Sequence, residues 1–120
     1  MAIIPKKSTD FTVVRRSDFD IRLTIKDNSG TAINLTGYTV EGEVYNKDRS
    51  TKYADWTVAY TNRANGIVDV SLSDDQTTTF TPEIVHYDFK YTSPNGKENV
   101  YLRGKLFMLE GYTSWAVQIL

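Results

Sequence analysis

His86 is the sole histidine of the chain and stands two residues before Asp88. Side chains two positions apart on a strand share a face, so this pair could hold a metal ion or polarise a nucleophile. A metal site normally takes three protein ligands, and a general base needs an acceptor held in a cleft. Because the pair alone meets neither requirement, we interpret His86 as a surface or interface residue.

Asp74 and Asp75 form the second group with possible chemistry, as ligands for calcium. Their spacing matches no calcium loop. Ser73 and Gln76 flank them at the spacing of a helix capping box, and acidic residues are favoured in the first turn of a helix. We therefore predict one short helical turn near residues 74–79.

No other motif in the chain indicates catalysis. A glycine-rich phosphate loop, a Gly-x-Ser-x-Gly elbow and a His-Glu-x-x-His helix are all missing, and there is no cysteine to act as a nucleophile or metal ligand. The sequence predicts no catalytic residue, no cofactor-binding residue and no metal-binding residue. The protein is not expected to be an enzyme or to need a cofactor.

Aromatic residues suggest binding instead. Four of them fall on the presumed outer sides of their strands or on a second buried face, namely Tyr45, Tyr60, Tyr101 and Phe107. Outward rings, together with Trp56, suit sugar stacking or protein contact, and the interpretation we favour is burial within an oligomer.

The elements that position these residues are strands. From Ile84 to Leu109 the chain predicts a long β-hairpin, with Asn95-Gly96 as a tight primed turn between its arms. Gly104 interrupts the second arm, which indicates a bulge or a close approach of another backbone. The inward residues of the first arm are Val85, Tyr87, Phe89 and Tyr91.

The rest of the chain repeats this alternation in short runs separated by turn signals such as residues 27–30 and 62–66. Strands spaced by about ten residues indicate an all-β, antiparallel β-sandwich of about 7–9 strands. A length of 120 residues fits one domain. We place that domain at residues 10–111, after an extended N-terminal arm (1–9) and before an apolar C-terminal tail (112–120).

The two ends are the predicted partner-binding segments. An apolar terminus is unusual, because chain ends are normally polar and frayed. The tail either folds back as a last edge strand of its own domain or docks on a neighbouring subunit, and the sequence is compatible with both. The residues predicted to contact partners are Ile3, Ile4, Tyr112, Trp115, Val117, Ile119 and Leu120.

Charge and hydropathy exclude some partners. The net charge is -1, from 14 basic and 15 acidic residues spread through the chain, so no basic stripe is available for nucleic acid. No apolar stretch is long enough to span a bilayer, and no signal peptide is evident. The absence of cysteine suits folding in a reducing cytoplasm.

Several motifs occur in an order that resembles small immunoglobulin-like β-sandwich proteins of tailed bacteriophages, in particular the N-terminal domain of the baseplate upper protein. The resemblance covers roughly residues 10–113, and its most specific parts are Leu35-Thr36-Gly37-Tyr38 and Leu102-Arg103-Gly104. Other parts are residues 11–19, Asp27-Asn28-Ser29-Gly30, Tyr87-Asp88-Phe89, Asn95-Gly96 and Glu110-Gly111-Tyr112-Thr113.

This resemblance implies a virion structural protein, assembled in the host bacterial cytoplasm, that acts as an adaptor in the tail, baseplate or neck. Its expected partners are other virion proteins and further copies of itself in a symmetric assembly. A capsid decoration protein and a carbohydrate-binding module are the alternatives.

Overall fold

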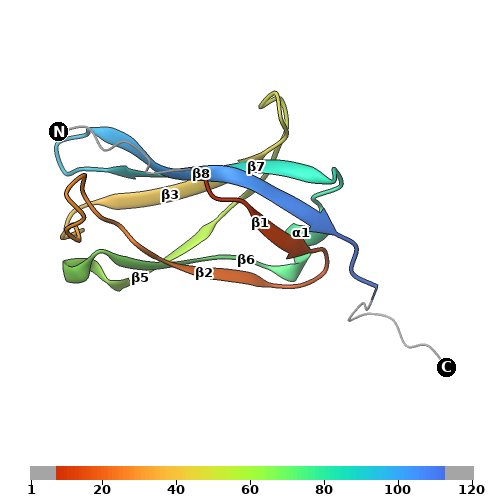
Figure 1. Cartoon of the computed structure of the whole chain (residues 1–120), viewed down its shortest axis with the longest axis horizontal. Helices are drawn as coiled ribbons and strands as arrows, with labels where there is room; N and C mark the ends of the chain where they lie inside the picture. Colours follow the sequence, from red (N-terminus) through yellow and green to blue (C-terminus); the bar gives the residue numbers. More distant parts are fainter. Residues whose placement is uncertain (1–7, 113–120) are drawn as a thin grey trace.

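The computed structural model describes residues 8–112. These residues form eight strands, one α-helix and one short 3-10 helix (Figure 1). In chain order they are β1 (Phe11–Val14), β2 (Phe19–Thr24), β3 (Thr39–Tyr45), β4 (Lys52–Asp55), β5 (Thr57–Asn62), η1 (Arg63–Asn65), β6 (Ile67–Leu72), α1 (Asp74–Thr78), β7 (Ile84–Thr92) and β8 (Glu98–Leu109).

The strands lie in two layers, with the five-stranded sheet above the three-stranded sheet in Figure 1. The larger sheet has the order β1-β8-β7-β3-β4 and the smaller one the order β2-β6-β5. In immunoglobulin lettering these orders contain G-F-C-C′ and B-E-D. The predicted immunoglobulin-like β-sandwich is confirmed, with one difference: β1 pairs parallel to β8 rather than antiparallel.

An aromatic cluster fills the space between the sheets around Trp56, the residue through which the chain passes from β4 to β5. The Trp56 ring lies 4.8 Å from the Phe89 ring and 5.9 Å from Tyr87. Gly42 on β3 makes room for Phe89, because a Cβ at Gly42 would lie 2.4 Å from a carbon of that ring. The ring that covers Gly42 is therefore that of Phe89.

The hairpin of β7 and β8 is confirmed, but its turn differs from the primed turn that Asn95-Gly96 predicts. The Ser93 N–H bonds to the Lys97 carbonyl at 2.9 Å and closes a three-residue loop. Only Gly96 in this loop has a positive φ, of 87°. A three-residue loop needs one left-handed residue rather than two, so the asparagine keeps an ordinary backbone.

The second arm also contains a bulge, three residues before Gly104. Phe89 pairs with Leu102 and Lys90 with Val100, so Tyr101 is an extra residue on β8. The bulge turns Tyr101 toward the core, and its hydroxyl donates to the Thr24 carbonyl at 2.8 Å. The prediction that Tyr101 faces outward is therefore wrong, because a bulge shifts the alternation by one residue.

The helical turn predicted near residues 74–79 is present as α1. Ser73 is its N-cap, and the full capping box with Gln76 is formed. The buried Thr77 hydroxyl donates to the Ser17 carbonyl at 2.9 Å, which joins α1 to the turn between β1 and β2. The two acidic residues lie in the first turn of the helix, where the dipole favours them.

Gly104 is the point where the chain segment before β1 meets β8. A Cβ at Gly104 would lie 1.9 Å from the Thr9 carbonyl oxygen, so a side chain has no room there. The Thr9 N–H donates to the Arg103 carbonyl at 2.9 Å, and the Tyr87 hydroxyl donates to the Thr9 carbonyl. The close backbone approach that Gly104 predicts is confirmed.

Replacement of Gly104 by alanine should destabilise the domain. The clash with the Thr9 carbonyl is against backbone, so overpacking should cost about 1–3 kcal/mol, or roughly 4–12 °C in Tm. Thermal unfolding of the Gly104→Ala protein measures this loss.

Gly30→Ala is the matched control, because Gly30 has a φ of 87° but no atom within 4 Å of its added Cβ. It should lose only the cost of a left-handed backbone, about 1 kcal/mol. Alanine normally stabilises a strand relative to glycine. A Gly104→Ala protein at least as stable as the wild type would therefore contradict the close approach of Thr9.

Candidate interaction surface

The outer face of the five-stranded sheet carries His86 and Asp88, the first pair considered for chemistry. The register aligns them in rows across the strands, because paired positions share a face. One row is Tyr45, His86 and Lys105, and the next is Glu43, Asp88 and Arg103. Within the described part of the chain, no three His, Asp or Glu residues come together as a metal site.

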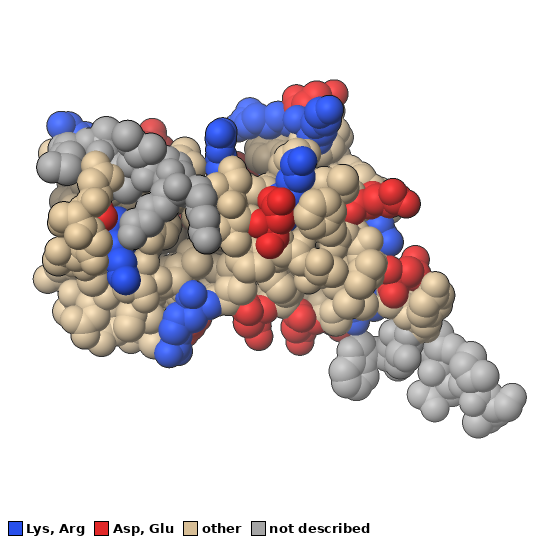
Figure 2. Space-filling view, viewed as in Figure 1, with Lys and Arg blue, Asp and Glu red and all other residues tan. Residues whose placement is uncertain are grey.

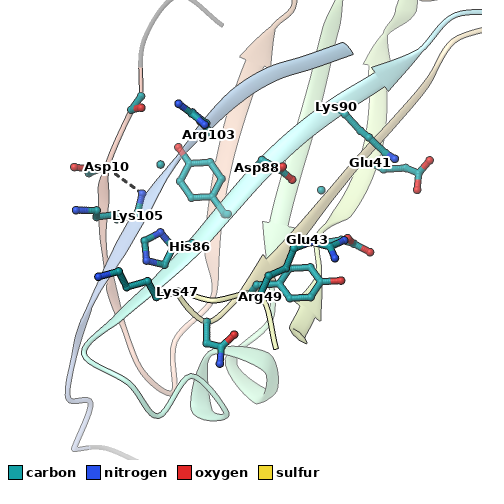
Figure 3. A pocket seen from close by; sticks show the side chains of 16 residues that line it. Asp10, Glu41, Glu43, Lys47, Arg49, His86, Asp88, Lys90, Arg103 and Lys105 are labelled. Atoms are coloured by element: carbon teal, nitrogen blue, oxygen red, sulfur yellow. Dashed lines mark hydrogen bonds between the residues drawn. The ribbon is translucent and has the colours of Figure 1, made fainter. Parts of the chain in front are cut away.

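These rows form the floor of a hollow of about 650 Å³ (Figure 3). The loop between β3 and β4, which rises above the upper layer in Figure 1, supplies Asn46, Lys47 and Arg49, and the segment before β1 supplies Ser8 and Asp10. In Figure 3, Lys47, His86 and Lys105 lie along one side, with Glu41 and Lys90 on the other. The hollow therefore has mixed charge, with Lys47 and Lys105 on one side and Lys90 beside Glu41 on the other.

Asp88 is the group whose charge is least well compensated in this hollow. It pairs directly with Glu43, a like charge, while Glu43 itself bonds to Lys52. Desolvation in the hollow and then the Glu43 carboxylate raise the pKa of Asp88, against Lys90, Arg49 and Arg103. Asp88 remains open to water, which screens part of both effects.

At the end of the same face lies a patch that we call the apolar strip. Its four side chains occupy outward positions on three neighbouring strands, with Ile84 opposite Phe107 and Val14 opposite Leu109. Their exposed fractions are 40% for Val14 and Ile84, 39% for Phe107 and 52% for Leu109. Adjacent exposed apolar side chains of this kind are typical of contact surfaces.

Beside the apolar strip, hydrogen bonds from the end of β1 hold the chain where it leaves β8. The Arg15 N–H donates to the Leu109 carbonyl at 2.9 Å, and Arg16 donates to Glu110 and to the Gly111 carbonyl. A Cβ at Gly111 would lie 1.9 Å from the Arg15 carbonyl oxygen. The exit of the C-terminal segment is thus fixed against the end of β1.

Tyr112 is the one predicted partner-binding residue that the structure describes, and it is 90% exposed. The other predicted contact residues lie outside the described residues, namely Ile3, Ile4, Trp115, Val117, Ile119 and Leu120. Sequence reasoning named Phe107 as an outward aromatic but missed the other members of the strip. Their signal was available, because Ile84 and Leu109 are apolar residues on the polar side of the β7–β8 hairpin.

The aromatic residues proposed as sugar platforms are mostly packed. Trp56 is buried, and the Tyr60 ring is covered by the Arg63 guanidinium at 3.6 Å. The Tyr60 hydroxyl accepts the Val40 N–H at 2.9 Å. The prediction that Trp56, Tyr60 and Tyr101 offer open stacking faces is therefore wrong, since these rings serve the contact between the sheets.

The adjacent residues Arg15 and Arg16 both bond to groups of the described chain. Arg15 donates to the carbonyls of Phe80, Thr81 and Pro82 at 2.8–2.9 Å. Across the view of Figure 2, acidic and basic side chains are interspersed, with no broad area of one sign. No helix within residues 8–112 is long and apolar enough to cross a bilayer.

Comparison with known proteins gives no match to a family model and none among curated proteins. Among solved structures, the chain is similar to the N-terminal domain of phage TP901-1 ORF48, with a TM-score of 0.56 and 12% identity over 85% of this chain and 84% of that one. It also matches the Lin-41 filamin domain, with a TM-score of 0.47 and 17% identity over 83% and 84% of the two chains. The first similarity shows a shared fold: this chain is a β-sandwich like that of a phage protein domain.

Replacement of Asp88 by asparagine should stabilise the domain at neutral pH. The raised pKa means that ionisation of Asp88 disfavours the folded state, and this penalty fades as the pH falls through the folded pKa toward the unfolded value of about 3.9. Surface changes stay within about 0.5 kcal/mol, so Tm should rise by up to ~2 °C at pH 7. Below about pH 3.5 the advantage should vanish, as measured by thermal unfolding at both pH values.

Glu41→Gln is the matched control, because it removes one negative charge from the same face. Glu41 pairs with Lys90 rather than with another carboxylate. Its replacement should leave Tm unchanged or lower at pH 7. Equal stabilisation by both substitutions would show that general charge, and not the Glu43–Asp88 pairing, is responsible.

Proposed function

We propose that this chain is a non-enzymatic virion structural protein of a tailed bacteriophage. It acts as an adaptor or assembly component of the tail, baseplate or neck, through contacts with other virion proteins and further copies of itself. It is assembled in the host bacterial cytoplasm and needs no cofactor, nucleic acid or membrane.

The observation that carries this proposal is the apolar strip beside the fixed exit of the chain. Four exposed apolar side chains meet across β7, β8 and β1, and the segment that follows Tyr112 is apolar too. Burial of such a strip against another subunit stabilises an assembly by about 25 cal/mol for each Å² removed from water. The fold shared with the phage ORF48 domain supports the same class of protein.

The charged hollow supports a role in recognition. A partner that meets this face must match both the lysines on the two sides of the hollow and the Glu43–Asp88 pair on its floor. Complementary charges of this kind select the correct partner and register more than they add affinity. An adaptor that connects two different proteins needs this selectivity as well as an apolar contact.

Phage particles assembled with a Phe107→Glu protein should incorporate it poorly. A carboxylate in the apolar strip loses its water when a partner covers it, which should cost more than about 1.4 kcal/mol, or tenfold in binding. Quantitative mass spectrometry of purified particles measures the copy number. Thr57→Glu is the control, because it places the same group on an exposed edge position of the smaller sheet and should be incorporated normally.

Crosslinking of the same particles should identify the neighbours. Lys105 and Lys47 line the hollow, so they should crosslink to other virion proteins, whereas Lys26, beyond the end of β2, serves as a comparison. Crosslinks to tail or baseplate proteins support the adaptor role, and crosslinks to the capsid shell alone would indicate a decoration protein. Absence of the chain from purified particles would contradict the proposal.

A further inference from the structure

The apolar strip and the C-terminal segment are both apolar, so they could pack against each other. In residues 113–120, Trp115, Val117 and Ile119 alternate with Ser114, Ala116 and Gln118. In an extended chain, alternate residues project to one side, so these three apolar side chains can all face the same surface. The strip offers a surface of the same character, with side chains on three adjacent strands.

The direction of the exit argues against contact within the same chain. The strip lies on the outer face of the five-stranded sheet, while residues 110–112 leave β8 away from that face and past the end of the sandwich (Figure 1). Gly111 is fixed against the Arg15 carbonyl, and Arg16 holds the Gly111 carbonyl. To reach its own strip, the chain would have to reverse around the end of β8 immediately after this fixed point.

We propose that residues 113–120 of one copy dock on the apolar strip of the next copy. The donor and acceptor are then different surfaces of the same chain, so the contact is heterologous, and repetition generates a ring or an open filament. Docking of this kind rests on the proposed assembly role, because that role requires contacts between copies of the chain.

The contact should be weak for one pair and stronger in a closed assembly. An eight-residue segment on a strip of four side chains covers less than a standard interface, so a dissociation constant on the order of 10 μM is expected. Ring closure makes the last contact intramolecular and raises the overall affinity. Association should therefore depend on protein concentration in solution.

Two full-length variants separate donor from acceptor. Phe107→Glu damages the strip and leaves the segment intact, whereas Trp115→Asp combined with Ile119→Asp damages the segment and leaves the strip intact. Size-exclusion chromatography with light scattering, at up to about ten times the expected dissociation constant, should show association of the wild type and monomers of each variant. A mixture of the two variants should form a 1:1 dimer and nothing larger, since one good contact remains.

Thr57→Glu should associate like the wild type, and thermal unfolding confirms that each variant is folded. A monomeric wild type would overturn the proposal. So would association of either variant alone, or a mixture of the variants that stays monomeric. In each of these cases the crosslinks and copy number in particles would still test the assembly role separately.

Cysteine pairs distinguish contact between chains from contact within a chain. The chain has no cysteine of its own, so introduced thiols report only on their positions. A protein with Ile84→Cys, mixed with one carrying Ile119→Cys, should form a disulfide-linked dimer on mild oxidation. One chain that carries both changes should form linked oligomers, and an internal disulfide in a monomer would overturn the proposal.

Discussion

The fold depends on the close parallel approach of β1 to β8. Two glycines of the β8 region allow it, because the Thr9 carbonyl occupies the place of a Cβ at Gly104 and the Arg15 carbonyl occupies that place at Gly111. Neither glycine has a left-handed backbone conformation. Glycine is needed at both positions because a side chain would have no room there. The approach fixes where the described chain enters the sheet, at Thr9, and where it leaves the sheet, at Gly111.

The sandwich has no disulfide, and aromatic packing holds its layers together instead. Trp56 contacts rings from both sheets, with Phe19 of β2 at 6.1 Å and Phe89 of β7 at 4.8 Å. The hydroxyls of Tyr60 and Tyr101 bond to backbone groups of the opposite sheet. Each pair of aromatic rings adds about 0.5–1.5 kcal/mol of stability beyond the contribution of the area it buries. Stabilisation of this kind suits a protein that folds without disulfide formation.

The sequence predicts those features of the fold that depend on interactions between residues close together in the chain. Alternation identifies β7, and the spacing of Ser73 and Gln76 identifies the capping box of α1, because both depend on residues close in the chain. The turn type predicted from Asn95-Gly96 was wrong. The turn type depends on the loop length, and the loop length depends on which residue pair is the last to bond across the two strands. The bulge at Tyr101 and the three carbonyl bonds of Arg15 depend on contacts distant in sequence, which no local pattern shows.

The candidate surface was harder to predict, because it exists only after strands are paired. Ile84 is distant from Val14 in the sequence, and β8 brings them to one face. A register slip by one residue would move every outward side chain of β8 into the core, so the buried residues hold the strip in place. The distance between the strip and the chain exit is therefore as rigid as the sheet. The proposed assembly role needs this rigidity, because small angular errors would accumulate around a ring of copies.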